Sequence, residues 1–328
     1  MGDTESETET QSTGDMGGGP GLDGQALLAM YREMVLCRAL DERIWMLNRQ
    51  GKAAIVASAQ GHEACQIGSV WALRKGLDRF YIYYRDLAVL VGLGLTPREI
   101  MLGFMAKAGE PLSGARQFPT HGAYPELGLV NQSNVIATHL PQAVGAALAA
   151  KMKGEDYIVI VYFGDGASSA GDTHEALNFA SVHKLPVIFF CENNLYGMGA
   201  PSATTLAVHQ QMYKLAEAYG IPGHRVDGND VLAVHELMRE LGQYVRAGNG
   251  PVFVEAQTYR LQGHSIADPA NYRPADEVEY WRSRDPIPRF KQWLMDEGLA
   301  SEEEIAQIDA AVDEEVVAAA EYADSSPF

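Results

Sequence analysis

The sequence predicts an α/β protein with a mostly parallel sheet flanked by helices on both faces. Two apolar runs, residues 157–163 and 187–191, each end in polar residues, and a helical pattern at 173–184 lies between them. A strand, a helix and a second strand in this order form a βαβ unit, whose strands are parallel and usually adjacent. A third apolar run at 251–258 alternates like a strand, and further helical segments separate these runs. Alternating strands and helices are typical of an α/β layered fold.

The elements outside this unit follow from the same patterns. The apolar residues of 25–49 recur at helical spacing, and Thr96 is a suitable N-cap for a helix at 97–106. The aromatic run at 80–84 predicts a short strand, whereas the Gly- and Pro-rich stretch 107–133 predicts a loop. The other segments that we expect to be helical are 61–75, 141–151, 206–219, 231–246, 278–281, 287–297 and 302–322.

Composition argues against several classes of protein. The net charge of −18 opposes binding to nucleic acid or to an anionic membrane. No apolar stretch has the roughly 20 residues needed to cross a bilayer, and the polar N-terminus does not resemble a signal peptide. Residues 1–22 are acidic and glycine-rich, which predicts a disordered tail before one domain at 23–328 that ends in a helical extension. Three widely spaced cysteines in apolar settings predict buried free thiols and a cytoplasmic location.

Polar side chains follow both strands of the βαβ unit. Asp165 comes directly after the first strand, between Gly164 and Gly166, and Asn194 follows the second. The carboxyl ends of parallel strands meet at the edge where open α/β sheets bind ligands. Carboxylate and amide oxygens suit Mg²⁺, which also takes oxygens from a diphosphate, and a backbone carbonyl after Asn194 could complete the shell. An isolated Gly-Asp-Gly is most often a simple turn, but its pairing with Asn194 favours a metal site.

A second polar region, residues 259–269, begins where the third strand ends. Arg260 suits binding of a phosphate. His264 could exchange protons near neutral pH, although a loop histidine is also commonly just solvated. Tyr84 and Arg85 end another expected strand, where they form either a phosphate clamp or an exposed pair.

Other familiar site patterns are absent from the sequence. It has no GxxxxGK[ST] P-loop, no third glycine after Gly164 and Gly166 to complete a dinucleotide fingerprint, and no HExxH zinc motif. Gly61-His62-Glu63 opens a helix, where an acid in the first turn is favourable whatever the function. His121 and His139 are left without an assignment.

One family has these motifs in this order. Gly164-Asp165-Gly166, followed after 26 residues by Asn193-Asn194, is similar to the thiamine diphosphate signature. Residues 28–327 resemble the alpha subunit of the thiamine diphosphate-dependent dehydrogenase, the first component of 2-oxo acid dehydrogenase complexes. The matching segments include Asp41-Glu42-Arg43, Gly61-x-Glu63-Ala64, Tyr84-Arg85-Asp86, Gly114-x-Arg116-Gln117, Cys191-Glu192-Asn193-Asn194-x-Tyr196-Gly197, Arg225-Val226-Asp227-Gly228 and the loop from Tyr259 to Arg273.

The resemblance implies a role for each site residue. Mg²⁺ would be held by Asp165, Asn194 and the carbonyl of Tyr196. The cofactor would be contacted by Tyr84, Arg85, Gly166, Ala167 and Arg260, with Ile136 bracing its bent shape. His264 would be the catalytic residue that stabilises intermediates and helps the acyl group reach a lipoyl arm. Ser265 matches a serine that some relatives phosphorylate, and a phosphate there would repel the diphosphate.

The resemblance also implies partners and a reaction. The chain would be active only with a beta subunit, as an α2β2 heterotetramer that oxidatively decarboxylates a small 2-oxo acid and passes the acyl group to the lipoyl domain of an acyltransferase. Pyruvate and branched-chain 2-oxo acids both stay open as substrates. Residues 191–199 are similar to pyruvate enzymes, whereas 136–145 are similar to branched-chain enzymes, and Ile55 replaces an aromatic residue of the pocket.

Other functions compete with this one. An acetoin dehydrogenase alpha subunit would have the same motifs. A transketolase-like sugar enzyme disagrees with the His264-Ser265 loop and with the chain length. A scaffold that kept only the cofactor fold without catalysis disagrees with the intact Asp165, Asn194, Arg260 and His264.

Overall fold

One sheet forms the centre of the computed structural model, which describes residues 21–54, 57–131 and 135–328. Its strands, in spatial order, are β2 (Gly122–Tyr124), β3 (Leu129–Asn131), β1 (Arg79–Tyr81), β4 (Val159–Gly164), β5 (Val187–Asn193), β9 (Val252–Gln257) and β8 (Gly223–Asp227). The neighbours pair in parallel except for β2 with β3. The predicted α/β class with a mostly parallel sheet is therefore confirmed.

The register of the three longest strands aligns their carboxyl ends. Gly164 at the end of β4 is paired with Glu192 in β5, and Asn193 in β5 is paired with Gln257 in β9. Asp165, Asn194 and the segment after Gln257 therefore leave the sheet at one edge, as the sequence predicted.

The central strands bury both faces, which explains their continuous apolar runs. Alternate residues of β4 and β5 belong to two different cores: Ile160 and Phe190 to one, Val161 and Phe189 to the other. The second core packs under α5 (His139–Lys153) and α6 (Gly171–Val182). The first packs under helices on the opposite face, namely α1 (Gly24–Arg49), α2 (Glu63–Trp71), α3 (Leu87–Leu93), α4 (Pro97–Phe104) and α8 (Val231–Arg246).

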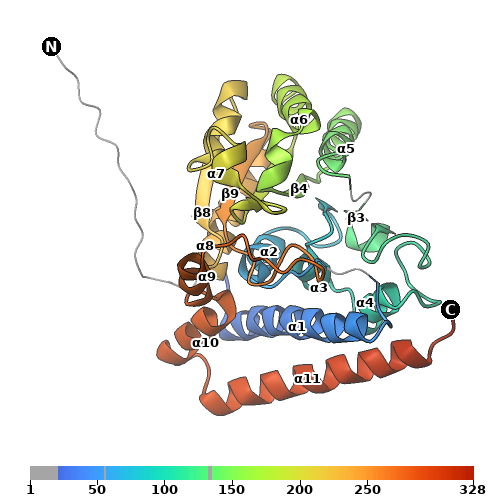
Figure 1. The fold of residues 1–328 in the computed structure, drawn as a ribbon. Helices are drawn as coiled ribbons and strands as arrows, with labels where there is room; N and C mark the ends of the chain where they lie inside the picture. Colours follow the sequence, from blue (N-terminus) through green and yellow to red (C-terminus); the bar gives the residue numbers. More distant parts are fainter. Residues whose placement is uncertain (1–20, 55–56, 132–134) are drawn as a thin grey trace.

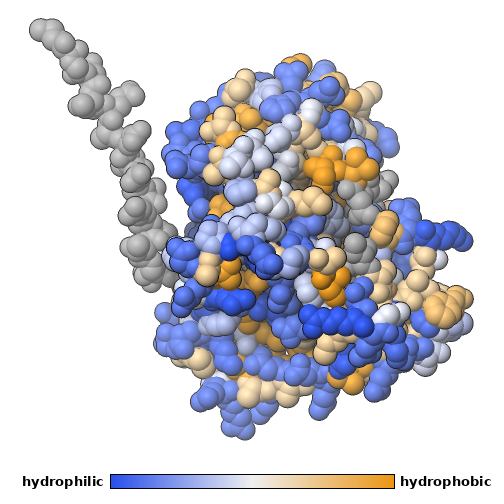
Figure 2. Space-filling view, viewed as in Figure 1, coloured by the Kyte–Doolittle hydropathy of each residue, from blue (hydrophilic) through white to orange (hydrophobic). Residues whose placement is uncertain are grey.

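Two C-terminal helices, α10 (Pro286–Asp296) and α11 (Glu302–Ser325), extend the first core. The helix before them, α9 (Ala275–Arg282), belongs to a separate small cluster in which Trp281 joins Tyr196 and Tyr259. The long helices α1 and α11 lie side by side along one end of the molecule, and the chain ends beside α4 (Figure 1). The face in Figure 2 is mostly hydrophilic, with hydrophobic residues in separate patches. No helix in the described part combines the length and apolar character needed to span a membrane.

Several expected elements are corrected by the structure. Residues 206–219 are not one α-helix: a short helix α7 (Ser202–Thr205) precedes them and a 3₁₀ helix, η3 (Met212–Tyr219), ends them. The expected loop 107–133 contains β2, β3 and a 3₁₀ turn, η1 (Pro125–Leu127), while the aromatic strand is limited to β1. The sequence patterns missed β8 and α3, because partners that are distant in the chain stabilise these short elements.

The predictions for the cysteines, for Ile55 and for the N-terminal tail can also be compared with the structure. All three cysteines are buried and free, as predicted. Ile55 and residues 1–20 of the expected disordered tail at 1–22 lie outside the described residues.

Candidate functional site

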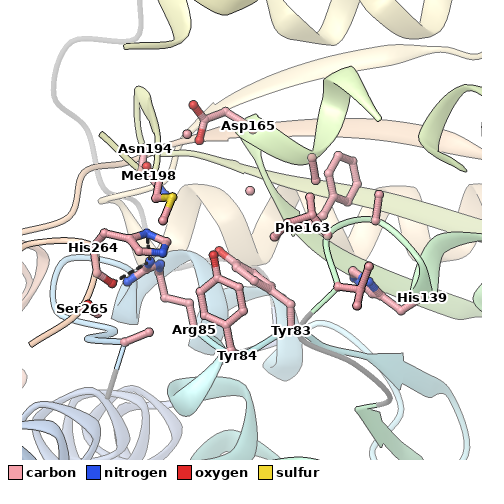
Figure 3. A pocket seen from close by; sticks show the side chains of 18 of the residues that line it. Tyr83, Tyr84, Arg85, His139, Phe163, Asp165, Asn194, Met198, His264 and Ser265 are labelled. Atoms are coloured by element: carbon pink, nitrogen blue, oxygen red, sulfur yellow. Dashed lines mark hydrogen bonds between the residues drawn. The ribbon is translucent and has the colours of Figure 1, made fainter. Parts of the chain in front are cut away.

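A cavity of about 890 Å³ opens at the carboxyl edge of the sheet. Residues from the ends of β1, β4 and β5 and from the loop after β9 point into it (Figure 3). The lining includes nearly every residue that the sequence singled out, namely Tyr84, Arg85, Ile136, Asp165, Gly166, Ala167, Asn194, Tyr196, His264 and Ser265. Arg260 is the exception: its side chain is 1% exposed and lies behind the cavity surface.

Asp165 is a buried carboxylate with unused hydrogen-bonding capacity. It begins a 3₁₀ helix, η2 (Asp165–Ser169), directly after β4, and it is 1% exposed. Its Oδ2 atom has no hydrogen-bond partner among the described residues. Burial raises the pKa of Asp165 to about 6, although the nearby Arg260 opposes this shift. Such a carboxylate is suited to a cation, which would stabilise its charged form.

Asn194 and Tyr196 form the adjacent wall at the end of β5. The backbone N–H of Tyr196 donates to Oδ1 of Asn194 at 3.3 Å, and Nδ2 of Asn194 lies 3.3 Å from Nε2 of His62. Both residues are buried and line the cavity together with Asp165. Figure 3 shows the Asp165 and Asn194 side chains next to each other at one side of the cavity.

Glycines bring two backbone segments together beside these side chains. A Cβ atom on Gly166 would lie 3.0 Å from Cα of Gly197. This contact is tighter than ordinary van der Waals packing, so a larger residue at Gly166 would push apart the turns after β4 and β5. The close approach keeps backbone N–H groups accessible to a phosphate group.

Two arginines are buried beside the carboxylate. Arg85 donates from Nη1 to the carbonyl of Ser58 at 2.6 Å, which fixes its guanidinium. Arg260 donates from Nη2 to the carbonyl of Met198 at 2.8 Å, but its Nε and Nη1 atoms have no partner in the described part of the chain. Burial and the neighbouring Arg85 both lower the pKa of Arg260. Two buried cations close together favour an anionic ligand, since it would relieve their repulsion.

His264 is held as a neutral imidazole. Its Nδ1 atom lies 3.3 Å from Nη2 of Arg85, which can only donate, so Nδ1 accepts and Nε2 carries the proton. Burial lowers its pKa to about 4, and Arg85 and Arg260 add to the shift. Its backbone N–H donates to Oδ2 of Asp268 at 2.6 Å, and the hydroxyl of Tyr272 donates to the same carboxylate at 2.7 Å. These bonds fix the loop that presents His264.

The structure adds cavity residues that the sequence patterns did not identify. Tyr83 lines the cavity, and its hydroxyl donates to Oε2 of Glu192 at 2.7 Å. His139 also lines it and is hydrogen-bonded through Nε2 to the carbonyl of Tyr162 at 2.7 Å. His121, the other unassigned histidine, lines the cavity as well. The doubled tyrosine at the end of an aromatic run was the available signal for Tyr83; the histidines had none.

Comparison with known proteins identifies the family. The sequence profile described as "Dehydrogenase E1 component" matches residues 31–328, which is most of the chain. The chain belongs to this family. It is 43% identical over 284 residues to the 2-oxoisovalerate dehydrogenase subunit alpha of Bacillus subtilis (strain 168), which covers 86% of each protein.

Other E1 relatives are similar over comparable lengths. The 3-methyl-2-oxobutanoate dehydrogenase subunit alpha of Mycobacterium tuberculosis is 40% identical over 290 residues, 88% of this chain and 76% of that protein. The pyruvate dehydrogenase E1 component subunit alpha of Rhizobium meliloti is 36% identical over 302 residues, 92% of this chain and 86% of that protein. The chain is therefore an alpha-type E1 subunit, a dehydrogenase component that works with a beta subunit.

Membership in the E1 family implies thiamine diphosphate as cofactor, and the residues present fit it. Among the described residues, an oxygen of Asp165 and two nitrogen atoms of Arg260, Nε and Nη1, have no hydrogen-bond partner, and both side chains are 1% exposed. No group of three His, Cys, Asp or Glu side chains in the described ranges could hold a metal ion by itself. A metal here would need ligands of other kinds, such as amide and carbonyl oxygens and the diphosphate itself.

Proposed function

We propose that this chain is the subunit that holds the diphosphate end of thiamine diphosphate, through Mg²⁺, in the oxidative decarboxylation of a branched-chain 2-oxo acid. The observation that carries the proposal is the unpartnered Oδ2 atom of buried Asp165 in the same cavity as Asn194 and Tyr196. Asp165, the Asn194 amide and the Tyr196 carbonyl supply hard oxygen ligands, and the diphosphate supplies others.

The two arginine side chains beside this metal site would bind the cofactor phosphates. Arg260 has two nitrogen atoms, Nε and Nη1, that can donate hydrogen bonds, and Arg85 lies next to it, so the buried positive charge matches a diphosphate. Tyr84 lines the same wall, and the backbone at Gly166 and Ala167 allows close approach. Ile136, which is 49% exposed, offers an apolar surface at the cavity wall against which the cofactor can rest.

His264 would handle protons beside the reacting carbon. Thiamine diphosphate supplies the electron sink that decarboxylation requires. The neutral His264 imidazole carries its proton on Nε2 and can donate it to oxygen of the substrate or of the acyl group. Arg85 orients the ring from the Nδ1 side, and Asp268 holds its backbone, so the donor keeps a fixed direction.

Branched-chain 2-oxo acids are the favoured substrates. 2-Oxoisovalerate and 3-methyl-2-oxobutanoate are two names for one branched acid, and the relatives that act on it are 43% and 40% identical to this chain. The pyruvate relative is 36% identical. Apolar side chains of Phe104, Phe118 and Val135 line the cavity, which suits an aliphatic side chain. Pyruvate is the second candidate, because it is smaller by only two carbon atoms and each methylene group discriminates by only about 1–3 kcal/mol.

The subunit would work in an α2β2 heterotetramer whose product goes to the lipoyl domain of an acyltransferase. The test is co-expression with an E1 beta subunit, calorimetry of thiamine diphosphate with Mg²⁺, and rates on 2-oxoisovalerate, pyruvate and acetoin. We expect magnesium-dependent binding, higher kcat/KM on 2-oxoisovalerate, and no activity of the lone chain. The absence of cofactor binding by the assembled subunits would overturn the proposal; higher kcat/KM on pyruvate or acetoin would overturn its substrate.

A further inference from the structure

His62 lies at the start of α2, and hydrogen bonds hold the backbone of the preceding residue, Gly61. Thr258 donates its hydroxyl to the carbonyl of Gly61 at 2.7 Å, and the N–H of Gly61 donates to Oε2 of Glu63 at 2.8 Å. Gly61 has a φ of +99°, and a Cβ atom there would lie 2.0 Å from the carbonyl oxygen of Tyr259. The segment before α2 is thus pressed against the chain that leaves β9, which places His62 beneath the cavity.

The His62 side chain contacts Asn194 directly. Nε2 of His62 lies 3.3 Å from Nδ2 of Asn194, and both side chains are buried. An amide nitrogen can only donate, so Nε2 of His62 must accept. The other end of the amide, Oδ1 of Asn194, accepts the backbone N–H of Tyr196. The two partners therefore distinguish the two ends of the amide.

We propose that His62 is a positioning residue for the metal site: it holds Nδ2 of Asn194, so that Oδ1 stays available to a divalent cation. The inference rests on the proposed role of Asn194 as a metal ligand. An amide rotated by half a turn has almost the same shape but would direct its N–H groups at the cation, and these cannot bind it. An accepting partner at this position disfavours the rotated form, in addition to the Tyr196 N–H that donates to Oδ1.

An imidazole meets this requirement, because its unprotonated nitrogen accepts a hydrogen bond without bringing a negative charge to the site. His62 is fully buried, and its Nε2 atom lies within hydrogen-bond distance of the Asn194 amide nitrogen. A carboxylate in place of His62 would also accept the hydrogen bond, but its negative charge would compete with Asp165 for the cation and for the arginines.

The test compares three variants of His62 in the assembled α and β subunits. His62→Gln places an amide oxygen near the position of Nε2 and keeps the acceptor. His62→Asn keeps a buried amide but is too short to reach Asn194, and His62→Leu removes the polar group. The affinity for Mn²⁺ in the presence of thiamine diphosphate is measured by electron paramagnetic resonance, with kcat at saturating metal and the melting temperature as second and third readouts.

We expect His62→Leu and His62→Asn to raise the Kd for Mn²⁺ by about 10–100-fold, as loss of a residue behind a metal ligand typically does. His62→Gln should restore the wild-type affinity, and kcat at saturating Mn²⁺ should change little in all three. Wild-type affinity in both His62→Leu and His62→Asn would overturn the inference, and so would equal losses in all three variants. Failure of the wild-type protein to bind Mn²⁺ at all would instead refute the proposed metal site.

Discussion

Nδ1 of His264 lies 3.3 Å from Nη2 of Arg85, so a residue expected to move protons touches a residue expected to bind phosphate. The contact determines the His264 tautomer, and the nearby positive charge keeps the imidazole neutral. With the proposed roles, cofactor binding and proton transfer would be coupled at this contact, because an anion bound by Arg85 would weaken its effect on His264.

The pH dependence of stability should report this environment. The His264 pKa is about 4 in the folded chain, against an ordinary 6.5, so the unfolded chain binds more protons between these values. The contribution of neutral His264 to the free energy of unfolding is therefore fully present above about pH 6.5. It is lost as the pH falls toward 4, because the unfolded chain takes up the proton first. Urea unfolding of the wild type and of His264→Gln at pH 7 and pH 5 isolates the effect. An equal pH dependence in both would contradict the prediction.

Loss of His264 should affect chemistry more than binding. His264→Gln in the assembled enzyme should lower kcat by about 10²–10⁴-fold, the usual contribution of an acid–base residue, while the Kd for thiamine diphosphate changes little. Steady-state rates and calorimetry check the two quantities. A large rise in Kd with normal kcat would show that His264 serves binding instead.

Removal of the Arg260 charge should weaken binding of the cofactor. Arg260→Met removes two donor nitrogens that have no partner in the described part of the chain, and charge-assisted hydrogen bonds are worth about 1.5–3 kcal/mol each. We expect the Kd for thiamine diphosphate to rise by at least about tenfold. Arg74→Met is the matched control, since it removes the same charge from an exposed ion pair with Asp156. Similar Kd values in the two variants would disprove a direct role of Arg260.

The buried carboxylate of Asp165 should destabilise the folded chain and should be necessary for metal binding. Its carboxylate is buried with one oxygen unpaired, so Asp165→Asn should stabilise the cofactor-free chain by about 1–3 kcal/mol at pH 8. The same variant should lose metal-dependent cofactor binding. Thermal unfolding and Mn²⁺ titration measure the two effects. A less stable variant would mean that Asp165 makes a structural contact instead.

Backbone geometry at Gly61 should be essential to the site. A Cβ there meets the carbonyl oxygen of Tyr259 at a left-handed φ, so Gly61→Ala should cost about 3 kcal/mol or more. Gly145→Ala in α5 is the control, because no atom lies within 4 Å of its new Cβ and alanine favours helices by about 0.5–1 kcal/mol. Chemical denaturation of both variants tests the difference, and equal stabilities would contradict it.

The sequence was most informative where both faces of a strand are buried. The runs of β4 and β5 are apolar throughout because each side chain enters one of two cores, and their polar ends therefore mark the edge of the sheet. Prediction was least successful at residues 206–219 and at β8, where local preference is weak and contacts with distant strands decide the conformation.

The amino-acid pattern alone predicted that Asp165 and Asn194 leave neighbouring parallel strands, because the strands of a βαβ unit are parallel and usually adjacent. It did not show that Arg260 lies behind the cavity surface, that Tyr83 hydrogen-bonds to Glu192, or that His62 contacts Asn194, which is 132 positions further along the chain. Such contacts join segments far apart in the chain. Tertiary packing also decides the charge of Asp165 and His264, since burial and neighbouring arginines control their pKa values.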